Sequence, residues 1–191
     1  MAEKQKTFRD IFDKYKFTAD DVTRSRSWYR QQASLLRKEK VTANQLLRNN
    51  REKRIIPGFM YMFLYDAKTK KKLPYWDAFP LVVPYARTQN GFMGLNFHYL
   101  PVPLRVLLLD ELMKYSTDKM MSDETRLRLT YQLIRRLDKA VPCVKEYLNS
   151  QVRSDFRKVD SEGWYTAMLL PVEQFNKAST NTVWADSRRK I

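Results

Sequence analysis

Runs of apolar residues in the middle of the chain predict a β unit over about residues 57–100. Residues 59–65 read FMYMFLY, which is apolar at both odd and even positions and therefore typical of a strand buried on two faces. Residues 79–85 (FPLVVPY) predict a second strand, whose two prolines favour an edge or barrel-rim position. Asn90-Gly91 lies between two candidate strands and favours a type I′ hairpin turn. We therefore expect a small twisted β-sheet or a barrel-like unit.

The remainder of the chain, about residues 104–191, is predicted to be a mainly helical half. Residues 104–115 (LRVLLLDELMKY) favour a helix that packs on the sheet, and a second helix is predicted over 122–140 with Ser122 as its N-cap. A third helix is predicted to restart after Pro142, with apolar residues on one side. The last segments favour a strand at 164–170 (WYTAMLL), a short helix at 171–178 (PVEQFNKA) and a polar tail at 183–191 (VWADSRRKI).

The first third contains no glycine or proline before Pro57 and predicts a basic helical arm over residues 1–56. Ser27 is a candidate N-cap for a helix that begins at Trp28, and its narrow apolar stripe indicates a helix on a surface. The predicted fold is therefore α+β: a small twisted sheet or barrel-like unit flanked by helices, with this arm in front. We expect two units, the arm at 1–56 and a single α+β domain at 57–191.

The net charge of the chain indicates the class of its binding partner. The 191 residues carry 36 Lys and Arg against 21 Asp and Glu, a formal net charge of +15, and residues 1–56 hold 15 of the basic and 7 of the acidic side chains. An aromatic content of 13% supplies a buried core, so the chain is expected to fold rather than to form a disordered polyelectrolyte. Such an excess exceeds the needs of solubility and indicates nucleic acid or another acidic macromolecule as partner.

The compartment follows from cysteine use and from the first residues. A single cysteine, Cys143, excludes a disulfide framework within one chain. The sequence MAEKQKTFRD has charges where a secretory peptide needs an apolar segment, and no apolar run approaches the roughly 20 residues of a membrane span. We expect a soluble, non-secreted protein without a membrane partner.

Signals for an enzyme are weak. A Cys-His dyad would need Cys143 and the only histidine, His98, to meet, although a buried thiol and a satisfied core histidine are the commoner fates. Asp66-Ala-Lys68 has the acid-x-Lys form of metal-dependent nucleases, with Asp77 as the only further acid in the β unit, but these are also ordinary turn residues. No phosphate-loop, dinucleotide or zinc-protease motif occurs. We predict no catalytic residues, no cofactor and no metal.

Signals for binding are stronger. The run RSRSWYRQQASLLRKEK mixes cations, which pair with phosphates, and aromatics, which can stack on a base or on a terminal pair. A basic turn on the β unit offers further phosphate contacts. The alternative is that these residues bind no ligand: the cations only keep the protein soluble, and Trp28 packs into the core. The predicted nucleic-acid-binding residues are Arg24, Arg26, Trp28, Arg30, Arg37, Lys38, Lys40, Lys70, Lys71 and Lys72.

A second possibility is structural assembly. The β unit offers more aromatic and Met side chains than a small sheet can bury alone, and such a surplus often forms a subunit interface. The assembly predicted from this surplus is a homo-oligomer. These residues are Phe59, Met60, Tyr61, Met62, Phe63, Tyr65, Tyr75, Trp76 and Phe79.

The central block resembles small proteins of T-even-like phages and marine cyanophages, which show the pattern GxMYxFxYDxKxKxxLPYYDxFPL followed by GFxGLNxHYLP. The matching positions here are Gly58, Met60, Tyr61, Phe63, Tyr65, Asp66, Lys68, Leu73, Pro74, Tyr75, Trp76, Asp77, Phe79, Pro80, Leu81, Gly91, Phe92, Gly94, Leu95, Asn96, His98, Tyr99, Leu100 and Pro101. Trp76 departs from the tyrosine of the pattern, but both are large aromatics. DETRLRLTYQ, PCVKEYL, VRSDF and VWADS also match, so the resemblance covers most of the chain from residue 24 onward.

This resemblance extends to the phage DNA end protector family, minor virion proteins that shield the ends of the packaged genome from exonuclease. It implies double-stranded DNA and other phage structural proteins as partners, and a location in the virion and, during assembly, in the host cytoplasm. It supplies no catalytic residues. The alternative that it leaves open is a neck, tail or baseplate component held by protein contacts.

Overall fold

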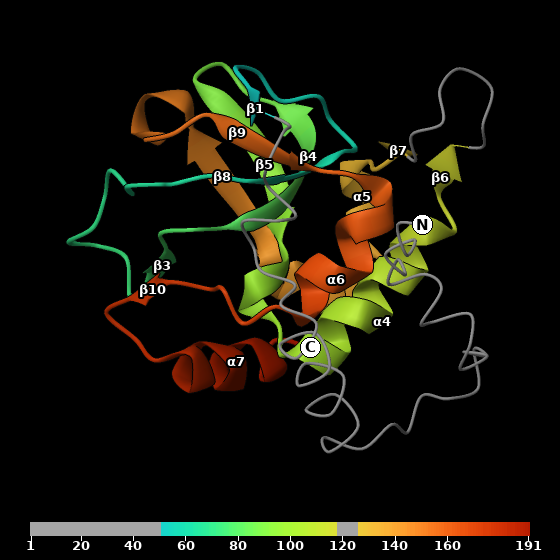
Figure 1. Cartoon of the computed structure of the whole chain (residues 1–191). Helices are drawn as coiled ribbons and strands as arrows, with labels where there is room; N and C mark the ends of the chain where they lie inside the picture. Colours follow the sequence, from blue (N-terminus) through green and yellow to red (C-terminus); the bar gives the residue numbers. More distant parts are fainter. Residues whose placement is uncertain (1–50, 118–125) are drawn as a thin grey trace, which may run out of the picture.

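The structure, a computed structural model, describes residues 51–117 and 126–191 (Figure 1). Its main sheet has six strands in the order β1-β9-β2-β4-β5-β8, and every pairing in it is antiparallel. These strands are β1 (Arg51–Glu52), β2 (Met60–Met62), β4 (Leu81–Arg87), β5 (Gly91–Asn96), β8 (Val144–Leu148) and β9 (Phe156–Val159). In the described residues β1 and β8 are the edges of an open sheet, so the α+β class is confirmed and the barrel-like alternative is wrong.

The other elements are two small sheets and several helices. β3 (Trp76–Asp77) pairs with β10 (Phe175–Asn176), and β6 (Ser116–Thr117) pairs with β7 (Arg126–Leu127). The α-helices are α4 (Val102–Met113), α5 (Tyr131–Arg135), α6 (Trp164–Leu169) and α7 (Thr180–Arg188). Short 3₁₀ helices are η1 (Phe97–Tyr99), η2 (Asp138–Cys143), η3 (Asn149–Gln151) and η4 (Ser161–Gly163).

The two faces of the sheet bury different clusters. On one face, Met60, Met62 and Leu95 pack in the main core, to which α4 contributes Leu108 and α6 contributes Met168. Figure 1 shows α4 and α6 lying together beside this sheet. The opposite face buries a mainly aromatic cluster formed by Ile55, Tyr61, Phe63, Val82, Phe92, Tyr147 and Phe156. The prediction that residues 59–65 form a strand buried on two faces is confirmed for β2, whose three residues are all buried.

The prolines of the second predicted strand need a different explanation. β4 lies between β2 and β5 and is therefore interior, so the edge or rim position was wrong. Pro80 precedes the first strand residue, and Pro84 lies where the β4–β5 register shifts in a bulge. Because a bulge interrupts the ladder, the missing N–H of Pro84 breaks no regular pairing.

The β4–β5 hairpin is confirmed, but its type I′ turn is not. Thr88 N donates to Gly91 O at 3.0 Å across the connection. A type I′ turn needs positive φ at both central residues, whereas the described residues with positive φ are Lys177 and Gly58. The register pairs Arg87 with Phe92, so Gln89 and Asn90 are at the centre of the turn and Gly91 is already the first residue of β5. The predicted pair Asn90-Gly91 is therefore not the central pair of the turn.

Several helix and strand predictions for residues 122–191 are wrong. The stretch predicted as a helix after Pro142 forms β8, η3 and β9, and 164–170, predicted as a strand, forms α6. Within the predicted helix 122–140, residues 126–127 form a strand and α5 begins only after Thr130, whose hydroxyl accepts a hydrogen bond from Leu133 N; Ser122 lies outside the described residues. The predicted short helix at 171–178 contains β10, and the predicted polar tail is α7.

Two expectations remain, the helix at 104–115 and the division of the chain into two units. The helix predicted at 104–115 is confirmed as α4, which starts after Pro101 with a proline in its first turn, where no N–H is required. The division into an arm at 1–56 and a domain at 57–191 stays a prediction. β1 nevertheless pairs with β9 in the main sheet, and Ile55 packs in its aromatic cluster.

Candidate nucleic-acid interface

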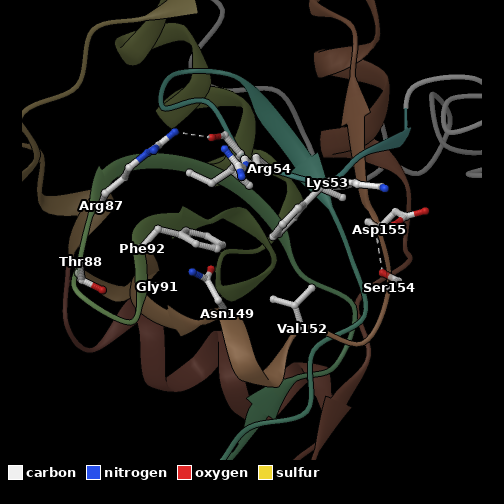
Figure 2. Close-up of a pocket in the computed structure, with 12 residues that line it drawn as sticks. Lys53, Arg54, Arg87, Thr88, Gly91, Phe92, Asn149, Val152, Ser154 and Asp155 are labelled. Carbon is white, nitrogen blue, oxygen red and sulfur yellow. Dashed lines mark hydrogen bonds between the residues drawn. The ribbon is translucent and has the colours of Figure 1, made fainter.

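A cavity of about 650 Å³ opens over the aromatic face of the sheet (Figure 2). Three chain segments that are distant in the sequence line it, one beside β1, one at the β4–β5 hairpin and one between β8 and β9. The lining residues are Lys53, Arg54, Ile55, Arg87, Thr88, Gly91, Phe92, Asn149, Val152, Ser154, Asp155 and Phe156. The cavity thus exists only because β5, β8 and β9 are assembled in one sheet.

Aromatic packing fixes the apolar floor. Phe92 and Phe156 line the cavity from below and are 1% and 7% exposed. The ring of Phe63 contacts both, with its centroid 5.9 Å from that of Phe92 and 5.1 Å from that of Phe156, and the Phe92 and Phe156 centroids are themselves 5.9 Å apart, all in edge-to-face contacts. Such contacts are favourable beyond the area that they bury, so the floor is rigid and preformed.

Three cations lie on the rim of the cavity. Lys53, Arg54 and Arg87 are exposed, and none of them forms an ion pair with a carboxylate in residues 51–117 and 126–191. Arg87 Nη2 donates to Ile55 O at 3.3 Å, which orients its guanidinium toward the β1 segment. Figure 2 shows Arg54 and Arg87 on one side of the cavity and Ser154 and Asp155 on another. Three cations against the single carboxylate of Asp155 make this an anion-attracting cavity.

The opposite wall is tied to its neighbours by backbone bonds. Asn149 N donates to Asn90 O at 2.9 Å, which joins the wall to the hairpin. Val152 forms a β-bridge with Tyr65, and Ser154 Oγ accepts from Leu64 N at 2.9 Å. These bonds hold the wall in place without a ligand.

Gly91 is required for the cavity to form. A Cβ at this position would lie 1.8 Å from Tyr147 O of the neighbouring strand β8. Only glycine permits β8 to approach this closely, and the approach brings Asn149 against the hairpin.

The predicted basic turn lies next to this wall. Lys72 N and Leu73 N both donate to Thr69 O, which confirms a turn here. Lys70 forms an ion pair with Asp66 at 2.5 Å, and Asp66 also faces Arg153 of the wall at 3.8 Å. Lys71 and Lys72 are exposed and make no ion pair with a described carboxylate. The base of this turn thus adjoins the wall through Asp66 and Arg153. A role of its lysines in binding phosphates stays a prediction.

The other predicted binding residues cannot be compared with the structure. Arg24, Arg26, Trp28, Arg30, Arg37, Lys38 and Lys40 lie outside the described residues. Sequence reasoning missed Lys53, Arg54 and Arg87. The run NREKR at 50–54 was a usable signal for the first two, whereas Arg87 stands alone between apolar and turn residues.

Three of the weak enzyme candidates, Cys143, His98 and Asp77, are buried in the core. Cys143 Sγ donates to Lys139 O at 3.6 Å, and burial raises the pKa of its thiol to about 12. Asp77 accepts hydrogen bonds from Asn96 Nδ2, Phe79 N and Gln174 N and contacts His98 Nδ1, so its carboxylate is fully used inside the protein. Asp66 is instead on the surface with Lys70, so the two acids of the nuclease hypothesis have separate roles.

Two kinds of feature are absent from residues 51–117 and 126–191. No group of three or more His, Cys, Asp or Glu side chains is placed to hold a metal ion. No helix in the same ranges has the length and apolar character needed to cross a membrane.

Comparison with known proteins decides the family. A family model described as phage T4 terminal DNA protecting protein matches residues 4–187. The chain belongs to this family. Comparisons with curated proteins and with solved structures found no match. Membership confirms the resemblance drawn from the central block and supports a role in protecting the ends of phage DNA.

Assembly remains a separate expectation. Met60, Tyr61, Met62 and Phe63 are at most 1% exposed within a single chain, so the sheet itself buries much of the predicted aromatic surplus. A homo-oligomer and other phage structural proteins as partners stay predictions.

Proposed function

We propose that this protein is a non-enzymatic phage virion protein that binds packaged double-stranded DNA at its ends and shields them from nucleases. Membership of the terminal DNA protecting family carries the proposal. The cavity supports it, because three exposed cations, none of them ion-paired with a described carboxylate, lie on its rim above an apolar floor. The adjoining Lys71 and Lys72 extend the basic surface beyond the cavity.

Binding would follow from charge and shape, without chemistry on the DNA. Lys and Arg side chains pair with phosphates and release counterions, which gives affinity that is independent of sequence and falls with salt. A protein seated on a duplex end denies an exonuclease its entry point.

In this proposal the predicted N-terminal arm also binds the DNA end. Arg24, Arg26, Arg30, Arg37, Lys38 and Lys40 would contact phosphates, and Trp28 would cap or stack on the end. The protein would travel with the genome in the virion, next to other phage structural proteins, after assembly in the host cytoplasm.

The test compares linear and closed DNA. Affinity for a blunt linear duplex and for a covalently closed circle of the same sequence is measured at several salt concentrations, and digestion of the linear duplex by an exonuclease is followed with and without protein. We expect tighter binding to the linear form, a steep salt dependence and slower digestion. Equal affinity for both forms would overturn end protection. Binding without salt dependence, together with a defined oligomer or tight association with a virion protein, would favour the neck, tail or baseplate alternative.

A further inference from the structure

We propose that the cavity over the aromatic face receives one unpaired terminal nucleotide of the DNA end. This inference rests on the proposed function, because it names the part of the DNA that the cavity would hold. The phosphate would lie at Lys53, Arg54 and Arg87, and the base and sugar would lie against the floor formed by Phe92, Val152 and Phe156.

Size selects a single nucleotide. A volume of 650 Å³ is in the range of pockets that enclose a small ligand. A cube of that volume has an edge of about 9 Å, less than the roughly 12 Å width of the major groove alone. A duplex therefore cannot enter the cavity, whereas one nucleotide separated from its partner can.

Charge places the phosphate on the rim. Arg54 and Arg87 are on the same side of the cavity in Figure 2, and Arg87 is oriented by its bond to Ile55 O. Guanidinium groups pair with phosphate oxygens in a two-point geometry that a lysine cannot provide. Asp155 is the one carboxylate of the lining, so the preferred place for the phosphate is the side of Arg54 and Arg87.

The lining also offers polar groups to a base. Thr88 Oγ1 is buried and has no hydrogen-bond partner among the described residues. Buried polar atoms are nearly always paired, so this hydroxyl is available to a ligand that enters the cavity. Asn149 is exposed on the wall, and an amide side chain can bond to a base edge. Phe92 and Phe156 are almost fully buried, so they would contact the base by packing against it, without an open ring face for stacking.

A DNA end fits this site better than the interior of a duplex. An internal base is paired and has a stacked neighbour on each side, whereas the terminal base has only one. Extruding a base is least costly where it is already loosely held. A cavity one nucleotide wide thus distinguishes an end from continuous duplex without reading sequence.

Variants of the lining test the proposal. Arg54→Gln and Arg87→Gln each remove a rim charge, and Asn149→Trp fills the cavity without changing charge. Lys71→Gln is the matched control, because it removes one exposed cation outside the lining. The DNAs are a blunt duplex, the same duplex with a one-nucleotide 5′ overhang, and a dumbbell whose ends are closed by loops. Circular dichroism and thermal melting are used to check that each variant folds.

We expect the wild type to prefer the overhang duplex to the dumbbell. Arg54→Gln and Arg87→Gln should each weaken binding to the overhang duplex by about tenfold. Asn149→Trp should abolish the preference while keeping the salt dependence. Lys71→Gln should weaken binding to every DNA by a similar factor.

The results separate this inference from the proposed function. If the wild type binds the dumbbell and the open duplexes equally, the proposed function fails. If it prefers open ends but all three lining variants keep that preference, the protein protects ends and the cavity does not hold the terminal nucleotide. Photocrosslinking from 5-iododeoxyuridine at the terminal position gives an independent readout, since we expect adducts in the peptides that contain Phe92 or Phe156.

A free nucleotide carries the same phosphate, sugar and base as the terminal nucleotide of DNA and could occupy the same cavity. Deoxyadenosine 5′-monophosphate is therefore titrated into the protein without DNA. Weak or absent binding supports a site that needs the rest of the DNA end. Micromolar binding that Asn149→Trp abolishes would overturn the assignment to a DNA end and indicate a mononucleotide pocket.

Discussion

Nδ1 of His98 lies 2.8 Å from Oδ2 of Asp77, and both side chains are completely buried. Burial opposes ionisation of Asp77, but the charge of His98 and hydrogen bonds from His98, Asn96 and Phe79 outweigh it and hold the pKa of the carboxyl below its ordinary value. An ionised carboxylate only accepts hydrogen bonds, so His98 Nδ1 is the donor. This pair joins β3 to η1, and the hydrogen bond from Asn96 Nδ2 to Asp77 joins β3 to the last residue of β5.

Replacing the acid should therefore weaken the fold. Asp77→Asn should lower the free energy of unfolding by about 2–5 kcal/mol, because it leaves buried donors without their charged acceptor. The measurement is urea unfolding at pH 7. Asp138→Asn, at an exposed position, is the control and should change stability by less than about 0.5 kcal/mol.

The same pair predicts a pH dependence. A carboxyl with a lowered folded pKa contributes stability above its unfolded pKa, near 3.8, and that contribution is lost as the pH falls through the folded value. Wild-type stability should therefore fall below about pH 4 more steeply than that of Asp77→Asn. Parallel acid profiles for the two proteins would contradict this role for Asp77.

The periodicity of apolar residues predicted an element correctly where the tertiary contacts of that segment favour the same structure. β2 is apolar on both faces, and α4 has a proline start and a continuous apolar surface, so both were found. Residues 144–152 place Val144, Tyr147, Leu148 and Val152 at helical spacing, but pairing of β8 with β5 imposes a strand. A short apolar run satisfies both periodicities, and only the partner strand decides between them.

The cavity could not be predicted for a related reason. Its three segments lie near residues 54, 90 and 152, and they meet because β9 pairs with β2 and β8 pairs with β5. Sequence charge identified Lys70, Lys71 and Lys72, which form a local cluster. It could not identify Arg87, which becomes part of a cationic group only after the sheet forms.

The thiol of Cys143 should be inert in the folded protein. It is fully buried, and burial raises its pKa to about 12, so only about one molecule in 10,000 carries the thiolate at pH 8. Labelling with a thiol-reactive disulfide at pH 8 should be negligible in buffer and reach one equivalent per chain in 6 M guanidinium. Rapid stoichiometric labelling of the folded protein would contradict the buried position of this residue.

Lys145 should impose a cost on the folded state that disappears at high pH. Burial lowers its pKa to about 8, although its ammonium donates to Pro142 O at 2.7 Å and lies 4.0 Å from the centre of the Tyr99 ring. The unfolded chain keeps this proton up to about pH 10.5, so the penalty is complete below pH 8 and is relieved between pH 8 and 10.5.

The comparison of Lys145→Met with wild type isolates this effect. The difference in unfolding free energy, variant minus wild type, should decrease by about 1–3 kcal/mol from pH 7.5 to pH 10. Lys114→Met, at an exposed position, should show a constant difference. If the Lys145→Met difference is also constant, the ammonium is not desolvated.

Gly91→Ala should destabilise the sheet. The added Cβ would meet Tyr147 O at 1.8 Å, so β8 must move away from β5 or the strands must distort. We expect a loss of about 3 kcal/mol or more, measured as a lower thermal midpoint. Asn90→Ala, at the exposed preceding position, is the control, and an equal loss in both variants would indicate that the turn and not the strand contact is responsible.

The basic turn should contribute affinity for DNA without contributing end preference. Lys71 and Lys72 are exposed and make no ion pair with a described carboxylate, whereas Lys70 is shared with Asp66. Each phosphate contact contributes about 0.9 to the slope of log affinity against log salt, so replacing all three lysines by Gln should reduce the slope by about 2 to 3. The smaller value applies if Asp66 keeps Lys70 from the DNA.

Fluorescence anisotropy between 50 and 200 mM salt gives the slope. The control is the replacement of Arg128, Arg135 and Arg136 by Gln, which removes an equal amount of exposed charge. Because the turn is outside the cavity, the ratio of affinities for open duplex and dumbbell should stay unchanged; a loss of that ratio would assign end recognition to the turn.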